Sequence, residues 1–162
     1  MKRDILIGAG SVAFILGALF GINPSAPRTT YSVDTNVSTS STTCQDVTEL
    51  TVSTSVGSRY RMSCGFRMRT NGIGGMKLCV SAPTTSVTPA GVMVANGQAL
   101  QLLGIGTGIT IPGIIGTTSY GTFDVNFGRI MAPGDIVIQF AHTTGLGNGI
   151  VEDGSQCEVN TY

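Results

Sequence analysis

Residues 60–68, YRMSCGFRM, form the most regular amphipathic stretch of the chain. Apolar side chains fall on one parity of this stretch, and they are Tyr60, Met62, Cys64, Phe66 and Met68. Because successive side chains of a β-strand point to opposite faces, the pattern predicts a strand with one face in a core and one basic face. The basic face extends into the flanking residues and carries Arg59, Arg61, Arg67 and Arg69.

A second strand is expected to follow this one closely. Asn71-Gly72 is a tight-turn signal, and residues 76–80, MKLCV, then place Met76, Leu78 and Val80 on one parity. We expect the two segments to pair as an antiparallel hairpin with their apolar faces coinciding. Further short Val/Ile/Thr/Phe runs separated by Gly and Pro predict strands at 50–56, 91–95, 99–103, 109–111, 122–127 and 136–140, and a short strand in the tail. The expected fold class is therefore all-β.

Four cysteines, Cys44, Cys64, Cys79 and Cys157, fit two disulfides in an exported domain. Three pairings are open. In the expected hairpin the index sum of Cys64 and Cys79 is odd, so their direct bridge requires a bulge, which Gly74-Gly75 could supply. Cys44 and Cys157 lie near the two ends of the domain and could tie these ends together. Because no C-x-x-C is present and His142 is the single histidine, a zinc cluster is not expected.

Residues 5–22, ILIGAGSVAFILGALFGI, carry no charge and predict a transmembrane helix about 27 Å long. Lys2 and Arg3 precede it, which predicts that the N-terminus stays inside and the following domain lies outside. Small residues recur every four positions along the helix, and this stripe for packing on another membrane helix is Ala9, Ala13, Gly17 and Gly21. A cleaved signal peptide and a buried core helix are alternatives, but the stretch lacks a good cleavage site and is long for a core helix.

Three segments are expected along the chain: a membrane anchor at 1–22, a Ser/Thr/Pro-rich stalk at 23–43 and a β-sandwich domain at 44–162. Within the domain, residues 78–123 contain no charged side chain. Part of so long an uncharged stretch must be core, and part is expected to face a partner, because protein interfaces are depleted of charge at their centres.

Charge and composition exclude several classes of function. The formal net charge is zero and only 11% of residues are charged, so no electrostatic argument supports nucleic-acid binding. The sequence offers no G-x-S-x-G and no paired carboxylates at a motif spacing, and residues 104–108, GIGTG, lack the lysine of a P-loop. A lone histidine at the end of an apolar strand, such as His142, is usually structural. We therefore expect no enzyme activity, no cofactor and no metal.

Two stretches resemble known domains. Residues 58–69 with 76–80, and residues 121–140, GTFDVNFGRIMAPGDIVIQF, resemble jelly-roll domains of the C1q and tumour-necrosis-factor type and the viral spike heads similar to them. This resemblance implies a jelly-roll-like antiparallel β-sandwich and a homotrimer. The layout of anchor, stalk and small Gly-rich β-domain is similar to that of membrane-anchored minor virion proteins of phages with an internal membrane.

The expected function is that of a membrane-anchored structural protein, a virion capsid or vertex-spike component acting by assembly. Its expected partners are the lipid bilayer through residues 5–22, and either further copies of the chain, with a trimer favoured, or neighbouring capsid or surface proteins. Basic residues gather early in the domain and acidic residues late, so these halves are expected to meet within one domain or across a subunit boundary. The alternative is an anchored cell-surface adhesin or carbohydrate-binding module, with Tyr120 and Tyr162 as candidate sugar-stacking residues.

Overall fold

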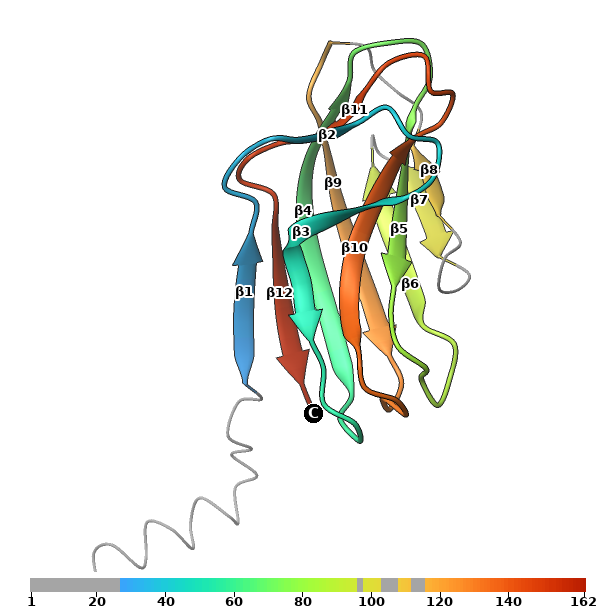
Figure 1. Ribbon diagram of the computed structural model, residues 1–162. Helices are drawn as coiled ribbons and strands as arrows, with labels where there is room; N and C mark the ends of the chain where they lie inside the picture. Colours follow the sequence, from blue (N-terminus) through green and yellow to red (C-terminus); the bar gives the residue numbers. More distant parts are fainter. Residues whose placement is uncertain (1–26, 96–97, 103–107, 112–115) are drawn as a thin grey trace, which may run out of the picture.

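Two antiparallel β-sheets pack face to face in this computed structural model, which describes residues 27–95, 98–102, 108–111 and 116–162 (Figure 1). The strands in chain order are β1 (Arg28–Ser32), β2 (Val37–Thr39), β3 (Gln45–Ser53), β4 (Tyr60–Thr70), β5 (Met76–Ser81), β6 (Ala90–Ala95), β7 (Gln98–Leu102), β8 (Ile109–Ile111), β9 (Ser119–Phe127), β10 (Asp135–His142), β11 (Gly149–Val151) and β12 (Gln156–Thr161). The expected all-β sandwich is confirmed.

The first sheet, sheet A, runs in the order β1-β12-β4-β9-β6-β7, with β11 pairing both β4 and β2. The second, sheet B, runs in the order β3-β10-β5-β8. The chain passes from sheet B to sheet A and back along β3, β4 and β5, so β4 lies across the core from the sheet that contains β3 and β5. Strand β4 is central in sheet A, since β12 pairs with it on one side and β9 on the other.

The core lies between the sheets and is built from the apolar parity of each strand. Strand β9 alternates strictly between buried and exposed side chains along its whole length. The predicted inward residues of residues 60–68 and of residues 76–80 are all buried. The largest completely enclosed rings come from three strands, and they are Phe66, Phe123 and Phe140. Burial of this apolar surface is the main free-energy term favouring the fold.

The expected hairpin between residues 60–68 and 76–80 is wrong. Strand β4 pairs with β12, β9 and β11, whereas β5 pairs with β10 and β8 in the other sheet. The connection through Asn71-Gly72 therefore crosses from sheet to sheet. Both strands present an apolar face to the core in either arrangement, so the alternation of side chains could not separate side-by-side pairing from face-to-face packing.

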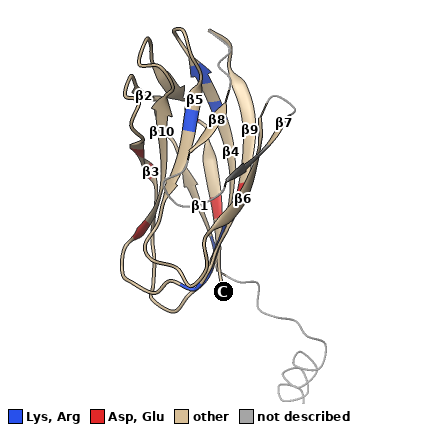
Figure 2. Ribbon diagram, turned by 90° about the vertical axis from the view of Figure 1, so that its right-hand side faces the viewer, with Lys and Arg blue, Asp and Glu red and all other residues tan. Residues whose placement is uncertain are grey.

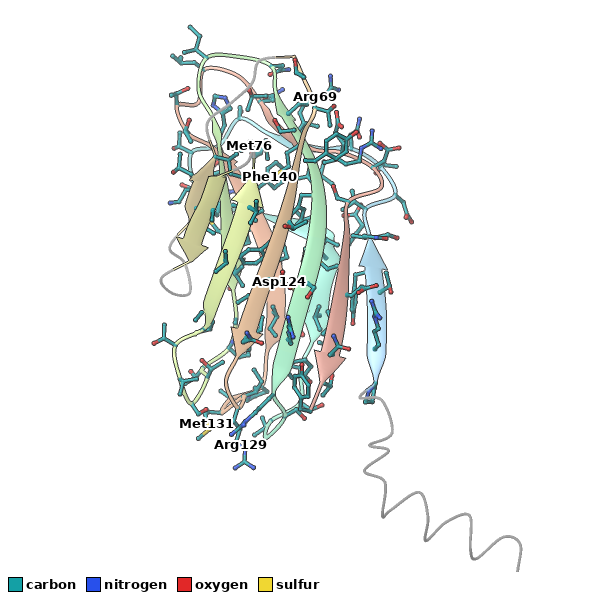
Figure 3. All side chains as sticks on the ribbon, turned by 180° about the vertical axis from the view of Figure 1, so that it is seen from behind. Arg69, Met76, Asp124, Arg129, Met131 and Phe140 are labelled. Carbon is teal, nitrogen blue, oxygen red and sulfur yellow. A yellow bond between two sulfur atoms is a disulfide. The ribbon has the colours of Figure 1, made fainter. Side chains whose placement is uncertain are left out.

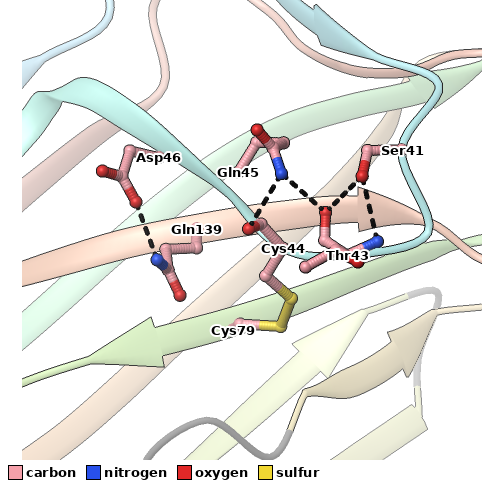
Figure 4. Close-up of a disulfide and its surroundings, with 7 residues drawn as sticks. All are labelled: Ser41, Thr43, Cys44, Gln45, Asp46, Cys79 and Gln139. Atoms are coloured by element: carbon pink, nitrogen blue, oxygen red, sulfur yellow. Dashed lines mark hydrogen bonds between the residues drawn. A yellow bond between two sulfur atoms is a disulfide. The ribbon is translucent and has the colours of Figure 1, made fainter.

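Both cysteine pairings considered from the sequence are also wrong, because the bridges are Cys64–Cys157 and Cys44–Cys79. Cys64 lies directly opposite Cys157 on neighbouring strands β4 and β12, with their Cα atoms 4.0 Å apart, and both side chains belong to the core. Cys79 has the parity of Lys77 and Ser81 on β5, so its bridge to Cys44 lies on the outer side of sheet B (Figure 4). The sequence-based pairing failed because it assumed the hairpin.

The beginning of the domain also differs from the expected stalk at 23–43. Strand β1 pairs with β12 from Arg28 onwards, β2 pairs with β11, and Val33 is only 1% exposed. Backbone hydrogen bonds thus hold these Ser/Thr-rich segments in sheet A, although their side chains add little to the core. The predicted anchor, with Ala9, Ala13, Gly17 and Gly21, lies outside the described residues. Within the part of the chain that the structure describes, no helix has the length and apolar character needed to cross a membrane.

Candidate functional site

The outer face of sheet A brings together residues from four neighbouring strands, and its middle is shaped by a glycine. Gly65 on β4 lies opposite Gln156 of β12 on one side and Thr122 of β9 on the other. Thr122 in turn lies opposite Val94 of β6. These residues form one row across the sheet, in which Gly65 contributes no side chain.

A hollow of about 490 Å³ opens over this row. Its lining comes from β4, β6, β9 and β12 and from the turn before β12, and consists of Gly65, Phe66, Arg67, Val94, Tyr120, Gly121, Thr122, Gly154 and Gln156. A Cβ atom placed on Gly65 would have no heavy atom within 4 Å, so the space above this residue is open. We call this site the Gly65 hollow. Its rim combines an exposed aromatic ring, an arginine and short polar side chains around an apolar floor, as binding sites for small ligands commonly do.

Arg67 and Arg69 on β4 converge on one buried acid above the hollow. Glu152 is only 7% exposed, and its Oε1 and Oε2 lie 2.9 Å from Arg69 Nε and 3.8 Å from Arg67 Nη2. The hydroxyl of Thr118 donates to the same carboxylate at 2.9 Å. Arg69 Nε is close to Glu152 but poorly aligned for a hydrogen bond, and Nε of each arginine is buried without a hydrogen-bond partner. The cluster therefore relies on charge attraction and on the Thr118 bond.

The other two arginines expected at an interface have different surroundings. Arg61 Nη2 lies 4.0 Å from Asp124 Oδ1, with both side chains about half exposed. Ser63 donates a hydrogen bond to the same Asp124 carboxylate. Arg59 lies at the far end of the sandwich, where its backbone pairs with Tyr162. Figure 3 shows Arg69 and Asp124 at separate heights of the sheet.

Early basic and late acidic residues thus meet inside one domain. Arg67 and Arg69 pair with Glu152, Arg61 lies near Asp124, and Arg28 pairs with Glu158. A role across a subunit boundary is not needed to explain the separation of these charges along the chain. Exposed pairs of this kind contribute little to stability, about 0–1 kcal/mol each, whereas the buried carboxylate of Glu152 depends on its partners.

Beside the Gly65 hollow, the surface formed by β6 and the first half of β9 carries no charge of its own, and the exposed Asp124 of β9, opposite Val92, marks its edge. Strands β6, β7 and β8 contain no charged residue, and the ribbons of β6 and β8 show neither blue nor red in Figure 2. We call this surface the uncharged face, and its exposed residues are Ala90, Val92, Val94, Ala99, Tyr120 and Thr122. Val92, Val94 and Tyr120 are 49%, 43% and 68% exposed. The face comes from residues 78–123, the stretch expected in part to face a partner.

Of the two tyrosines considered for sugar stacking, only Tyr120 lines the Gly65 hollow. Its ring lies on β9 directly opposite Arg67 of β4. Tyr162 is 63% exposed beside a separate depression of about 670 Å³ at the other end of the sandwich, together with Arg59 and Val87. The structure therefore does not bring the two tyrosines together, and one ligand ring would not bridge them.

His142 is fully buried at the end of β10. Its Nδ1 accepts hydrogen bonds from the backbone N–H of Gly145 at 3.0 Å and of Thr144 at 3.4 Å, while its Nε2 has no partner. Nδ1 is therefore the acceptor that ties the ring to the loop after β10. Because no reactant can reach this enclosed ring, its geometry is that of a structural residue that holds the loop after β10. Among the described residues, no cluster of His, Cys, Asp and Glu could hold a metal ion.

Sequence reasoning missed the Gly65 hollow and the role of Glu152. The alternation of arginines along residues 59–69 is interrupted at Ser63 and Gly65, and this interruption is the signal that could have located the hollow. Glu152 lies in a segment without clear strand periodicity, so only the fold shows that it faces Arg67 and Arg69. No protein-family model matches this chain, and no curated protein or solved structure matches it either.

Proposed function

We propose that the chain is a membrane-anchored structural protein of a virion, a capsid or vertex-spike component that acts by assembly. The observation that carries the proposal is the uncharged face. Val92, Val94 and Tyr120 are large apolar or aromatic side chains, each more than two-fifths exposed, that lie together on adjacent strands. A charge-depleted surface with an aromatic residue has the composition of the centre of a protein interface.

The strand order supports a finer assignment of the sandwich as a jelly roll. The orders β1-β12-β4-β9 and β3-β10-β5-β8 form two four-stranded layers, and along these eight strands the chain changes layer at every step except from β5 to β8. The β6–β7 hairpin is an addition that extends the first layer beyond β9. Capsid and spike proteins commonly use this architecture. In the C1q and tumour-necrosis-factor type it is associated with homotrimers, so we favour a trimer formed through the uncharged face.

Membrane attachment is the second part of the proposal. Residues 5–22 would cross the bilayer with the N-terminus inside, and the sandwich would lie outside, on the virion membrane or shell. The two disulfides agree with an oxidising location for the domain. The stripe Ala9, Ala13, Gly17 and Gly21 would let neighbouring anchors pack closely, in support of the same oligomer.

Introduction of a charge on the uncharged face tests the proposal. Val94→Glu places a carboxylate on the exposed side of β6 without touching the core, and Thr110→Glu on the exposed side of β8 is the matched control. Chemical cross-linking of the full chain in vesicles should give trimer bands for the wild type and for Thr110→Glu, and mainly monomer for Val94→Glu. Equal cross-linking of all three proteins would refute assembly through this face.

A carbohydrate-binding module is the second candidate, and the Gly65 hollow favours it. Tyr120 supplies an exposed ring for stacking, and Arg67, Thr122 and Gln156 supply hydrogen-bonding groups on the same rim. Gly65→Leu should fill the hollow without a backbone clash, since a Cβ there meets nothing. If the chain binds glycans here, Gly65→Leu and Tyr120→Ala should each abolish binding to a glycan array, and Tyr162→Ala should not. Retained binding by both variants would exclude the hollow.

A further inference from the structure

Three loops at one end of the sandwich are joined by backbone hydrogen bonds into a single surface. They are the connections between β3 and β4, between β5 and β6, and between β9 and β10. Gly57 N donates to Ile130 O at 2.9 Å, and Ile130 N donates to Ser58 O at 2.9 Å. Met131 N donates to Thr84 O at 2.8 Å, which links the third loop. We call this surface the three-loop end.

Each of the three loops exposes one large apolar side chain at this end. Val56, Val87 and Met131 are 59%, 61% and 57% exposed. Arg59 and Arg129 are exposed beside them, and Arg129 Nε donates to the carbonyl of Gly57 at 3.1 Å. Asp135, at the start of β10, is the exposed acid of the same end. Apolar side chains interspersed with arginines are typical of surfaces that lie in the interfacial region of a bilayer.

The chain also enters the sandwich at the three-loop end. Pro27 O, just before β1, accepts a hydrogen bond from Thr161 N at 3.3 Å, and the next residue, Tyr162, pairs its backbone with Arg59. Figure 3 shows Arg129 and Met131 at the end of the molecule where β1 begins, and Arg69 and Met76 at the other. The six steps of chain from residue 22 to Arg28 can span at most about 20 Å. An anchor ending at residue 22 would therefore hold this end close to the bilayer.

We propose that the three-loop end docks on the surface of the lipid bilayer, with Val56, Val87 and Met131 in the interfacial region. The sandwich then stands upright on the membrane, and the uncharged face on its side remains free for neighbouring copies. This inference rests on the membrane anchor of the proposed function. Ile73 and Leu146 are also exposed, at 69% each, but they lie at the opposite end, away from the point where the chain enters. They are expected to stay in water.

Tryptophan fluorescence in the full chain tests the docking, because the natural sequence contains no tryptophan. Single substitutions Val87→Trp and Met131→Trp report on the three-loop end, Leu146→Trp on the opposite end, and Phe20→Trp on the predicted anchor. Each variant is reconstituted into phosphatidylcholine vesicles with and without brominated acyl chains, which quench only tryptophans at membrane depth. Circular dichroism checks that every variant keeps its β-structure.

The expected result is loss of at least half of the fluorescence for Phe20→Trp, Val87→Trp and Met131→Trp, with little change for Leu146→Trp. Quenching of Phe20→Trp alone would overturn the docking while leaving the anchor intact. Failure to quench Phe20→Trp would overturn the anchor, and with it both the proposed function and the docking. Stronger quenching of Leu146→Trp than of Val87→Trp would show that the opposite end faces the bilayer.

Discussion

Removal of the Cys64–Cys157 bridge should cost the domain more stability than removal of Cys44–Cys79. The first bridge joins neighbouring strands β4 and β12 inside the core and closes a loop with a sequence separation of 93. The second lies on the outer side of sheet B and closes a loop with a separation of 35. The perturbation is replacement of each pair by alanine, Cys64→Ala with Cys157→Ala and Cys44→Ala with Cys79→Ala.

The difference in loop length sets the expected magnitudes. A cross-link restricts the unfolded chain, and its effect grows with the logarithm of the loop length. For a separation of 93 the chain-entropy relation gives about 4.6 kcal/mol. For a separation of 35 it gives about 3.8 kcal/mol. Cys64 and Cys157 are both buried, whereas only Cys79 of the second pair is, so the loss of buried contacts adds more to the first value.

Guanidinium unfolding of residues 23–162, followed by circular dichroism, measures both losses. The fragment includes all of β1, and the wild type serves as the reference for a two-state fit. Since small domains are stable by only about 5–15 kcal/mol, each double variant should show a large shift of its midpoint. Peptide mapping without reduction identifies the bridges in the same preparation.

Two results would refute this reasoning. One is a peptide map that pairs Cys64 with Cys79, or Cys44 with Cys157. The other is a loss of less than about 1 kcal/mol for the Cys64 and Cys157 double variant, which lies below the range of native disulfides. Either result would mean that β4 and β12 are not neighbours as described.

Three further predictions concern charge, packing and the start of the domain. Glu152→Gln should lower the free energy of unfolding by about 1–3 kcal/mol, because Arg67 and Arg69 lose their buried partner. Asp124→Asn, at an exposed pair, should lower it by less than about 1 kcal/mol. Equal effects of the two variants in thermal unfolding would contradict the special role of the Glu152 carboxylate. Phe123→Ala should lower the free energy of unfolding by about 3–5 kcal/mol, and Thr122→Ala should change it by no more than about 0.5 kcal/mol, as measured by denaturant unfolding. A larger loss for Thr122→Ala than for Phe123→Ala would mean that the other face of β9 lies in the core. Deletion of residues 1–32 removes the five β1–β12 residue pairs and should lower the free energy of unfolding by about 1–5 kcal/mol relative to deletion of residues 1–22. An unchanged melting temperature would instead support the prediction of a stalk that extends to residue 43.

Side-chain alternation predicted most strands of this fold and the residues that face its core. The inward sides of residues 60–68, 76–80 and 122–127 are buried as expected. Strand β3 was predicted less well, because its register against β10 shifts between Val137 and Gln139. Both Val47 and Leu50 are buried although they differ in parity, so a strict alternation could not describe this strand.

Features that depend on contacts distant in sequence could not be predicted. Pairing of β4 with β12 decides the Cys64–Cys157 bridge, and nothing local to either segment specifies this partner. The strands within 23–43 were missed because their Ser/Thr-rich composition is typical of a linker. An edge strand is held by backbone hydrogen bonds, which can form with such side chains as well. The Gly65 hollow likewise arises from four strands that meet only in the folded sheet.

The mass in solution of residues 23–162, measured by light scattering after size exclusion under oxidising conditions, tests the central claim most directly. The account predicts a mass corresponding to a trimer, which falls to that of a monomer when Val94→Glu is introduced on the uncharged face. A wild type that is monomeric at every concentration would contradict assembly through the sandwich. It would leave the Gly65 hollow, as a ligand-binding site, the better supported function.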